Sequence, residues 1–367
     1  MLAPVYLPAM RHLSLLLLCL LAACSGSRRV SDEAKWGLHD VQRFDANNPV
    51  LHPDAGPRFR CPLRRDPVRW QESMVACPAA VVREGRMCLL YRAEDATGTS
   101  RIGLAESGNG LGFSRRNDPV LHPDRDDHKD REWPGGCEDP RIVRRDDGLY
   151  VMTYTAYDGS NARLCIATSG DLSTWEKRGL AFPQKKHRSL WSKAGAIVCE
   201  RTREGDVVAC KVKGKYWMYW GDADLYVATS DDLLSWEPEE EKGGSFVRAL
   251  TPRASYFDSR SVEAGPFALL RREGILLVYN STNSASSGDK GLAADAPAVG
   301  QALFSKTRPA QLLARANAPL LQPERAYEQG DAGQASTFLS GMAWWHDRWL
   351  LYYSAGSRTI AAGSARE

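Results

Sequence analysis

The sequence lacks the patterns that identify several common classes of protein. Its nine cysteines are scattered without a Cys-X-X-Cys pair, so neither a metal site nor a disulfide framework is indicated. Lysine and arginine are interspersed with acidic residues, the formal net charge is only +3, and there is no basic tract suited to nucleic acid. No long helical period occurs, and after the N-terminal region no segment is apolar enough to span a membrane. We therefore expect no metal and no nucleic-acid partner.

The composition is that of an ordinary globular protein with many aromatic residues. Of the 367 residues, 43% are hydrophobic and 25% are charged, and the chain has 11 tryptophans and 13 tyrosines. Aromatic side chains suit a β core, and they also suit contact with sugar rings.

The N-terminus has the features of a secretory signal. Arg11 precedes a short apolar run, Leu13–Leu21, which is too short to cross a bilayer. The following Leu21-Ala22-Ala23-Cys24 resembles a bacterial lipobox, in which the cysteine is lipidated. We predict a signal peptide at residues 1–23, lipidation of Cys24, a tether at 24–44, and a location at the bacterial outer membrane or in the periplasm. The alternative is an ordinary cleaved signal with an incidental Cys24.

A short aromatic strand ending in tyrosine recurs along the rest of the chain. The terminal tyrosines are 63, 65, 60 and 74 residues apart. Repeats of this length, made of short strands and turns, predict an all-β fold, a five-bladed β-propeller over residues 45–367. A pair of β-sandwiches is the alternative, but it does not explain the regular spacing. The repeated strands are Met87–Tyr91, Tyr150–Tyr154, Tyr216–Tyr219, Ile275–Tyr279 and Trp349–Tyr353.

After each of these tyrosines the chain becomes polar. Equivalent strand ends of a propeller converge near its axis, so we expect these segments to line one binding site. The candidates for substrate binding in these segments are Arg92, Asp95, Asp158, Asp222 and Asn280.

Two acids and an arginine are concentrated in Gly136–Arg141. Proline fixes its own φ and restricts the preceding residue, so Pro140 can fix the direction of the Asp139 carboxylate. A carboxylate held beside an arginine is what acid–base chemistry on a glycosidic bond requires. We take Glu138, Asp139 and Arg141 as site candidates; the alternative is a solvated turn.

In several segments the chain, from about residue 48 to its C-terminus, resembles glycoside hydrolase family 130. The resemblance implies a five-bladed propeller that acts on β-mannoside oligosaccharides, with Asp139 as the catalytic acid. Family members are inverting phosphorylases that release mannose 1-phosphate, or hydrolases of β-1,2-mannosides. The matching segments are Tyr91–Asp95, Gly136–Arg141, Lys193–Ile197, Gly214–Tyr219, Phe257–Ser259, Glu263–Pro266 and Gly274–Asn280.

The resemblance leaves the reaction type open. Glu263 is the candidate for the general base, with binding of sugar hydroxyls as its alternative role. Arg141, Lys193 and Arg253 could hold phosphate as the co-substrate of a phosphorylase; no other cofactor is expected. We favour hydrolysis, because a sugar phosphate released outside the inner membrane would be lost to the cell.

Two departures from the family concern carboxylates expected near the axis. Ser340-Gly341 and Ser354–Ser357 stand where relatives often carry an acid. They leave open the linkage specificity, the identity of the base, and the alternative of a non-catalytic glycan-binding lipoprotein.

The lipobox leads to a direct prediction. Expressed in a bacterial host, the protein should yield a diacylated or triacylated N-terminal peptide beginning at Cys24, detected by mass spectrometry of the membrane fraction. An unmodified peptide that begins elsewhere would contradict the lipobox.

Overall fold

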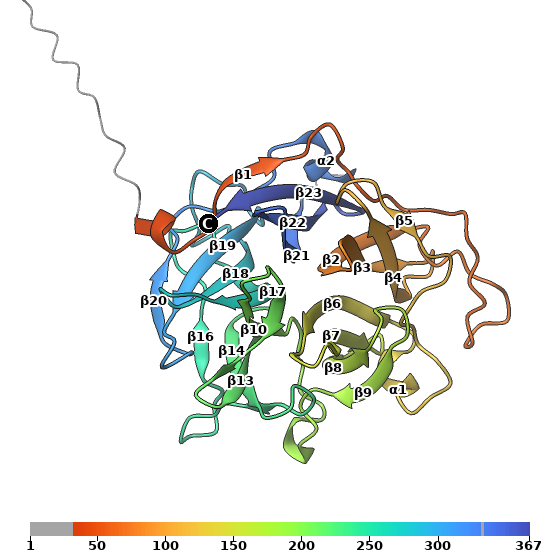
Figure 1. Cartoon of the computed structure of the whole chain (residues 1–367), viewed down its shortest axis with the longest axis horizontal. Helices are drawn as coiled ribbons and strands as arrows, with labels where there is room; N and C mark the ends of the chain where they lie inside the picture. The colour runs from red at the N-terminus through yellow and green to blue at the C-terminus, as the bar shows by residue number, and fades with distance from the viewer. Residues whose placement is uncertain (1–31, 332–333) are drawn as a thin grey trace, which may run out of the picture.

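The computed structural model describes residues 32–331 and 334–367 (Figure 1). The predicted signal peptide and Cys24 lie outside these residues. The described chain is all-β, as predicted, with two short α-helices, α1 (Lys129–Glu132) and α2 (Ala326–Gln329), and two short 3-10 helices, η1 (Asp32–Lys35) and η2 (Lys185–His187). None of the helices in the described ranges has the length and apolar character needed to cross a membrane.

The strands form successive antiparallel groups along the chain. The first group is β2 (Met74–Arg83), β3 (Arg86–Glu94), β4 (Ser100–Ser107) and β5 (Ser114–Arg115). The second is β6 (Gly136–Arg144), β7 (Tyr150–Tyr157), β8 (Ala162–Ser169) and β9 (Glu176–Leu180).

The third group is more divided than the others. It contains β10 (Ala196–Arg201), β11 (Val207–Ala209), β12 (Lys211–Val212), β13 (Lys215–Trp220), β14 (Leu225–Ser230), β15 (Glu237–Pro238) and β16 (Arg248–Leu250). The fourth is β17 (Ser261–Leu270), β18 (Ile275–Thr282), β19 (Pro297–Phe304) and β20 (Leu312–Arg315).

The last group joins the two ends of the described chain. It contains β21 (Thr337–Trp345), β22 (Arg348–Ala355) and β23 (Thr359–Arg366), and β1 (His39–Arg43) pairs antiparallel with β23. An unpaired β23 would expose a row of backbone donors and acceptors, and β1 satisfies them. Residues 39–43, which the sequence analysis assigned to the tether, therefore form a strand of this group.

The repeated tyrosines are core residues of the second strand in four groups and of β13 in the third group. Their rings are buried, and each hydroxyl donates a hydrogen bond, as buried tyrosines usually require. The acceptors come from outside the strand, for example Glu132 Oε1 for Tyr154 and Glu328 Oε1 for Tyr353, both at 2.8 Å. The tyrosine repeat, which predicted the architecture, therefore serves to pack the core.

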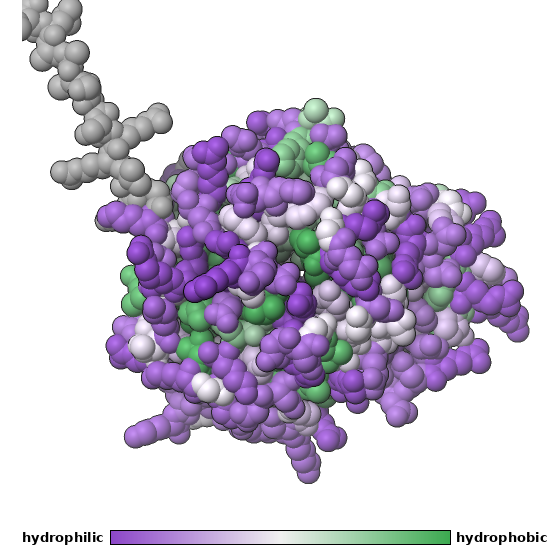
Figure 2. Space-filling view, in the orientation of Figure 1, coloured by the Kyte–Doolittle hydropathy of each residue, from purple (hydrophilic) through white to green (hydrophobic). Residues whose placement is uncertain are grey.

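The first strands of the groups surround a common centre (Figure 1). Each contacts the first strand of the group on either side: β2 contacts β6 and β21, β10 contacts β6 and β17, and β17 contacts β21. Figure 2 shows that hydrophilic residues cover most of the face seen along this direction, with hydrophobic residues in small separate areas.

Four of the five first strands share a second feature, an irregularity in their pairing with the next strand. The register shifts at Cys77-Pro78 in β2, Asp139-Pro140 in β6, Gly265-Pro266 in β17 and Ser340-Gly341 in β21. Bulges of this kind bend a strand and change the direction of its side chains. One of them lies at the Asp139-Pro140 pair singled out from the sequence.

Candidate active site

Asp139 occupies the bulge of β6 with a left-handed backbone, φ 49°. A non-glycine residue in this region is uncommon and is held there by its surroundings. Gly136 (φ 119°) allows the same strand to approach β4, because a Cβ at this position would lie 2.1 Å from the carbonyl oxygen of Ser100. The segment is therefore locally strained and closely packed.

Arg141 fixes this segment to the neighbouring group. Its guanidinium donates to the carbonyl of Asp139 at 3.0 Å, to that of Ala264 at 2.9 Å and to that of Gly265 at 2.7 Å. The same guanidinium lies 3.6 Å from Glu263 Oε1. Because Arg141 is only 2% exposed, it links the bulges of β6 and β17 and brings Glu263 towards Asp139.

Arg92, on β3, gathers three carboxylates. Its guanidinium contacts Glu94, lies 3.0 Å from Glu138 Oε1 and 3.2 Å from Asp139 Oδ1. On the other side of Asp139, Lys193 Nζ lies 3.6 Å from Oδ2.

We call this set of side chains the carboxylate cluster. Four of its members keep about a fifth of the side chain exposed (19–21%), so solvent or a substrate can reach the cluster. Its members are Arg92, Glu94, Glu138, Asp139, Arg141, Lys193 and Glu263.

The acids of the cluster differ in their charge state. Burial by itself would raise the pKa of Asp139, but Arg92, Lys193 and Arg141 hold it well below its usual range. Burial raises the pKa of Glu138 to about 7 and that of Glu263 to about 7, and the nearby cations only partly oppose this. In the free protein Asp139 is ionised, whereas each of the two glutamates gains or loses its proton near neutral pH. Perturbed carboxylates of this kind are typical of acid–base sites.

Cys77 and Ser354 adjoin the cluster; the sequence analysis did not propose Cys77, and it named Ser354 only as a departure from the family pattern near the axis. Cys77 (φ 46°) occupies the bulge of β2, and its backbone N–H donates to Ser354 Oγ at 2.9 Å. Burial, followed by the nearby Asp139 charge, raises the pKa of the Cys77 thiol well above its usual value, so the thiol is neutral. The sequence did contain a signal for Cys77: Cys77-Pro78 in β2 matches Asp139-Pro140 in β6, and both pairs lie at bulges.

Glu94 was also missed, although its neighbour Asp95 was proposed. Alternate residues of a strand point to the same face, so Arg92 and Glu94 lie together and Asp95 does not. Asp95 instead accepts from Arg101 at 2.9 Å, and Arg101 is fully buried. The alternation of β3 was enough to make this distinction.

Asp158, Arg253 and Asn280 also have partners outside the cluster. Asp158 pairs with Arg163 at 2.7 Å, and Arg253 pairs with Asp258 at 2.9 Å. Asn280 lies opposite Glu263 in the β17–β18 register, but its amide exchanges two hydrogen bonds with the backbone of Leu339.

Asp222 takes an intermediate position. Its Oδ2 accepts from the indole of Trp191 at 3.0 Å, and its charge is close enough to help raise the pKa of Glu263, which burial raises most.

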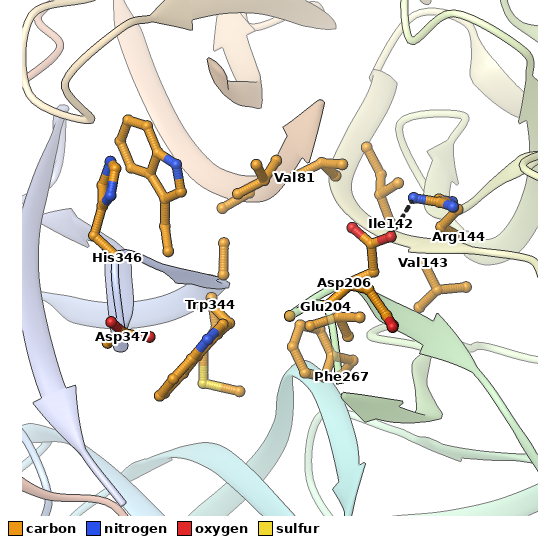
Figure 3. A pocket seen from close by; sticks show the side chains of 17 residues that line it. Val81, Ile142, Val143, Arg144, Glu204, Asp206, Phe267, Trp344, His346 and Asp347 are labelled. Atoms are coloured by element: carbon orange, nitrogen blue, oxygen red, sulfur yellow. Dashed lines mark hydrogen bonds and ion pairs between the residues drawn. The ribbon is translucent and has the colours of Figure 1, made fainter. Parts of the chain in front are cut away.

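A cavity of about 360 Å³ lies elsewhere, beyond the bulges along the first strands (Figure 3). Val81, Ile142, Phe267, Trp344 and His346 are among its lining residues, and no site residue proposed from the sequence lines it. Its one ion pair in Figure 3, Arg144–Asp206 at 3.0 Å, lies on one side. The cavity therefore does not contain the carboxylate cluster.

Within residues 32–331 and 334–367, no group of three or more histidines, cysteines and acids is placed to hold a metal ion. The site is defined instead by carboxylates with separated pKa values on strands that meet at one centre. It is that of an enzyme that uses acid–base chemistry, as glycosidases do.

Comparison with known proteins gives the family. Residues 46–367 match the profile of glycoside hydrolase family 130, described as beta-1,4-mannooligosaccharide phosphorylase. The chain belongs to this family of mannoside hydrolases and phosphorylases, which confirms the resemblance found in the sequence.

Two solved structures are similar over most of their length. A glycosyl hydrolase from Bacteroides ovatus is 39% identical, with a TM-score of 0.88, over 90% of this chain and 94% of that one. Another is 40% identical, with a TM-score of 0.87 and the same coverage; it represents GH130 glycoside hydrolases that target beta-1,2 mannosidic linkages in Candida mannan. The 1,2-beta-oligomannan phosphorylase of Thermoanaerobacter sp. (strain X514) is 26% identical over 302 residues, which are 79% of this chain and 89% of that protein.

The contacts of Asp95 predict a structural role. Asp95→Ala should lower the free energy of unfolding by about 3–5 kcal/mol, because it leaves the buried Arg101 charge without its carboxylate. Denaturant unfolding measures the loss, and turnover per folded molecule should change little. The control Asp158→Ala should cost less, because Arg163 is 18% exposed and can be hydrated. Lost turnover at unchanged stability would instead place Asp95 in the site.

Proposed function

We propose that the protein is an inverting β-mannosidase that hydrolyses β-1,2-linked manno-oligosaccharides. The observation that most supports hydrolysis is the balance of positive and negative charges in the carboxylate cluster. Three cations, Arg92, Arg141 and Lys193, face four carboxylates, and every cation contacts a carboxylate or a backbone carbonyl. Inorganic phosphate, an anion, needs cations that are free to bind it, whereas water and a neutral sugar do not. The similarity to solved GH130 hydrolases supports the same reaction.

Asp139 is the proposed general acid and Glu263 the proposed general base. Inverting hydrolysis requires one carboxyl group to protonate the leaving oxygen and another to activate water on the opposite side of the sugar. Asp139 is an anion in the free protein, so it must gain a proton before it acts. A bound sugar ring excludes water and draws Lys193 towards its hydroxyls, and both effects raise the pKa of Asp139.

Glu263 suits the other role. Its pKa of about 7 makes it an effective base near neutral pH, where part of the population is ionised. Arg141 holds Glu263 and the Asp139 backbone at once, which keeps the two acids at a constant separation.

Phosphorolysis is the second candidate, because the curated relatives at 26% identity are phosphorylases. Of the cations first considered for phosphate, Arg253 is paired with Asp258 and Arg141 with backbone carbonyls. Only Lys193 remains a plausible phosphate ligand among the three.

We also propose that the strand groups form a five-bladed β-propeller. The regular spacing of the tyrosine strands and the ring of contacts between the first strands support it. The proposed substrate site is then at the axis, and the protein acts as a lipoprotein of the outer membrane or in the periplasm, anchored through Cys24.

The products distinguish the two reactions. With β-1,2-mannobiose the protein should release free mannose at the same rate with and without phosphate. Asp139→Asn keeps the size of the side chain but removes the transferable proton, so it should slow turnover by about 10²-fold or more. Chromatography of the products and circular dichroism of the variant provide the measurements. Accumulation of mannose 1-phosphate with a requirement for phosphate would establish phosphorolysis instead.

The raised pKa of Glu263 predicts a pH dependence. A base acts when ionised, so kcat/KM should rise as pH increases through about 7. Glu263→Gln should be slow and should lose this rise, because glutamine does not titrate. Glu138→Gln is the matched control, since Glu138 also has a pKa of about 7. If the rise disappears only in Glu138→Gln, the base is Glu138.

A further inference from the structure

Trp191 is exposed to solvent, unlike every other tryptophan in the part of the chain that the structure describes. It lies between β9 and β10, and 47% of its surface is accessible. The remaining described tryptophans are buried or half-buried. A single exposed hydrophobic side chain is common, so a role for Trp191 has to rest on its contacts.

The contacts of Trp191 hold its ring in one orientation. Its indole N–H donates to Asp222 Oδ2 at 3.0 Å. The backbone beside it is held as well, because Gly221 N–H donates to the carbonyl of Lys193 at 2.9 Å and Ser192 Oγ accepts from the β8 backbone at 3.0 Å. An exposed ring that is already ordered loses little conformational entropy when a ligand packs on it.

The same contacts place Trp191 beside the carboxylate cluster. Lys193, two residues further along the chain, reaches Asp139 Oδ2 at 3.6 Å. Two residues span at most ~7 Å, so the backbone of Trp191 lies within ~7 Å of the backbone of Lys193, whose side chain extends into the cluster. Asp222, its hydrogen-bond partner, lies within electrostatic reach of Glu263 on the other side of the cluster.

The chemistry of the exposed face fits a sugar ring. A β-mannopyranoside carries its axial hydrogens at C1, C3 and C5 on one face, which is therefore apolar, while the axial 2-hydroxyl points from the other face. The apolar face can pack flat on an indole, as other apolar surfaces do. The indole offers no charge to an anionic ligand, and its only donor is occupied by Asp222.

We propose that Trp191, held by Asp222, is the stacking platform for a third mannosyl ring of the substrate, beyond the two rings that the cleaved bond joins. This inference rests on the proposed function and adds a substrate preference to it. The platform has nothing to bind when the substrate is too short to reach it. The protein should therefore favour manno-oligosaccharides of three or more units over the disaccharide.

The affinity for β-1,2-mannotriose relative to β-1,2-mannobiose tests the platform. Calorimetry in the Asp139→Asn background measures both without turnover. Mannotriose should bind about three- to tenfold more tightly, the range of one aromatic contact, and Trp191→Ala should remove most of this difference. Trp191→Phe keeps an aromatic face and should retain part of it. Asp222→Ala frees the indole and should reduce the ratio, while Asp222→Asn keeps an acceptor and should restore it.

Leu313→Ala is the matched control, because Leu313 is another exposed apolar residue (51%), on β20. It should leave the ratio unchanged. Equal affinities for the two sugars, a ratio unaffected by Trp191→Ala, or no binding of either sugar would overturn the platform. Hydrolysis of mannobiose by the wild-type protein is measured separately. If that fails, the proposed function fails, and the affinity ratio still decides the role of Trp191.

Discussion

The left-handed backbone of Asp139 is the constraint on which the site depends. It requires the bulge at Asp139-Pro140, and the bulge is held in place by Arg141 through carbonyls on β6 and β17. Removing Arg141 would therefore disturb two neighbouring strand groups together. Strain of this kind persists only where the surrounding structure enforces it, and it is common where a side chain must be aimed.

The position of Asp139 creates an electrostatic conflict that gives the cluster its chemistry. Close carboxylates cannot all be ionised in a partly buried place, so the cations favour one of them. Arg92 and Lys193 lie nearest to Asp139, which stays an anion, while burial leaves Glu138 and Glu263 with pKa values of about 7. A substrate that displaces water or a cation can redistribute these protons, and this is how a static arrangement becomes an acid–base site.

The two serines that depart from the family pattern have structural roles here. Ser340 Oγ donates to the carbonyl of Pro78 at 2.8 Å, and Ser354 Oγ accepts from the N–H of Cys77 at 2.9 Å. Both hydroxyls join the last strand group to the bulge of β2, where β21 and β22 contact the first strand group. A carboxylate at position 354 would add charge beside Cys77, whose thiol lies near Asp139. The hydroxyls instead supply neutral contacts, and the proposed acid and base lie on β6 and β17.

The sequence alone determined the all-β fold, the family and the central motif, because short tyrosine strands and an acid-acid-Pro-Arg segment are local patterns. Alternation along β3 would also have identified Glu94 in place of Asp95. The tertiary structure alone decided which polar residues meet. Asp95, Asp158, Arg253 and Asn280 resemble site residues in the sequence, yet each has its own partner. Cys77 and Ser354 adjoin the cluster through contacts between strands far apart in the chain, and no local pattern specifies such long-range pairings.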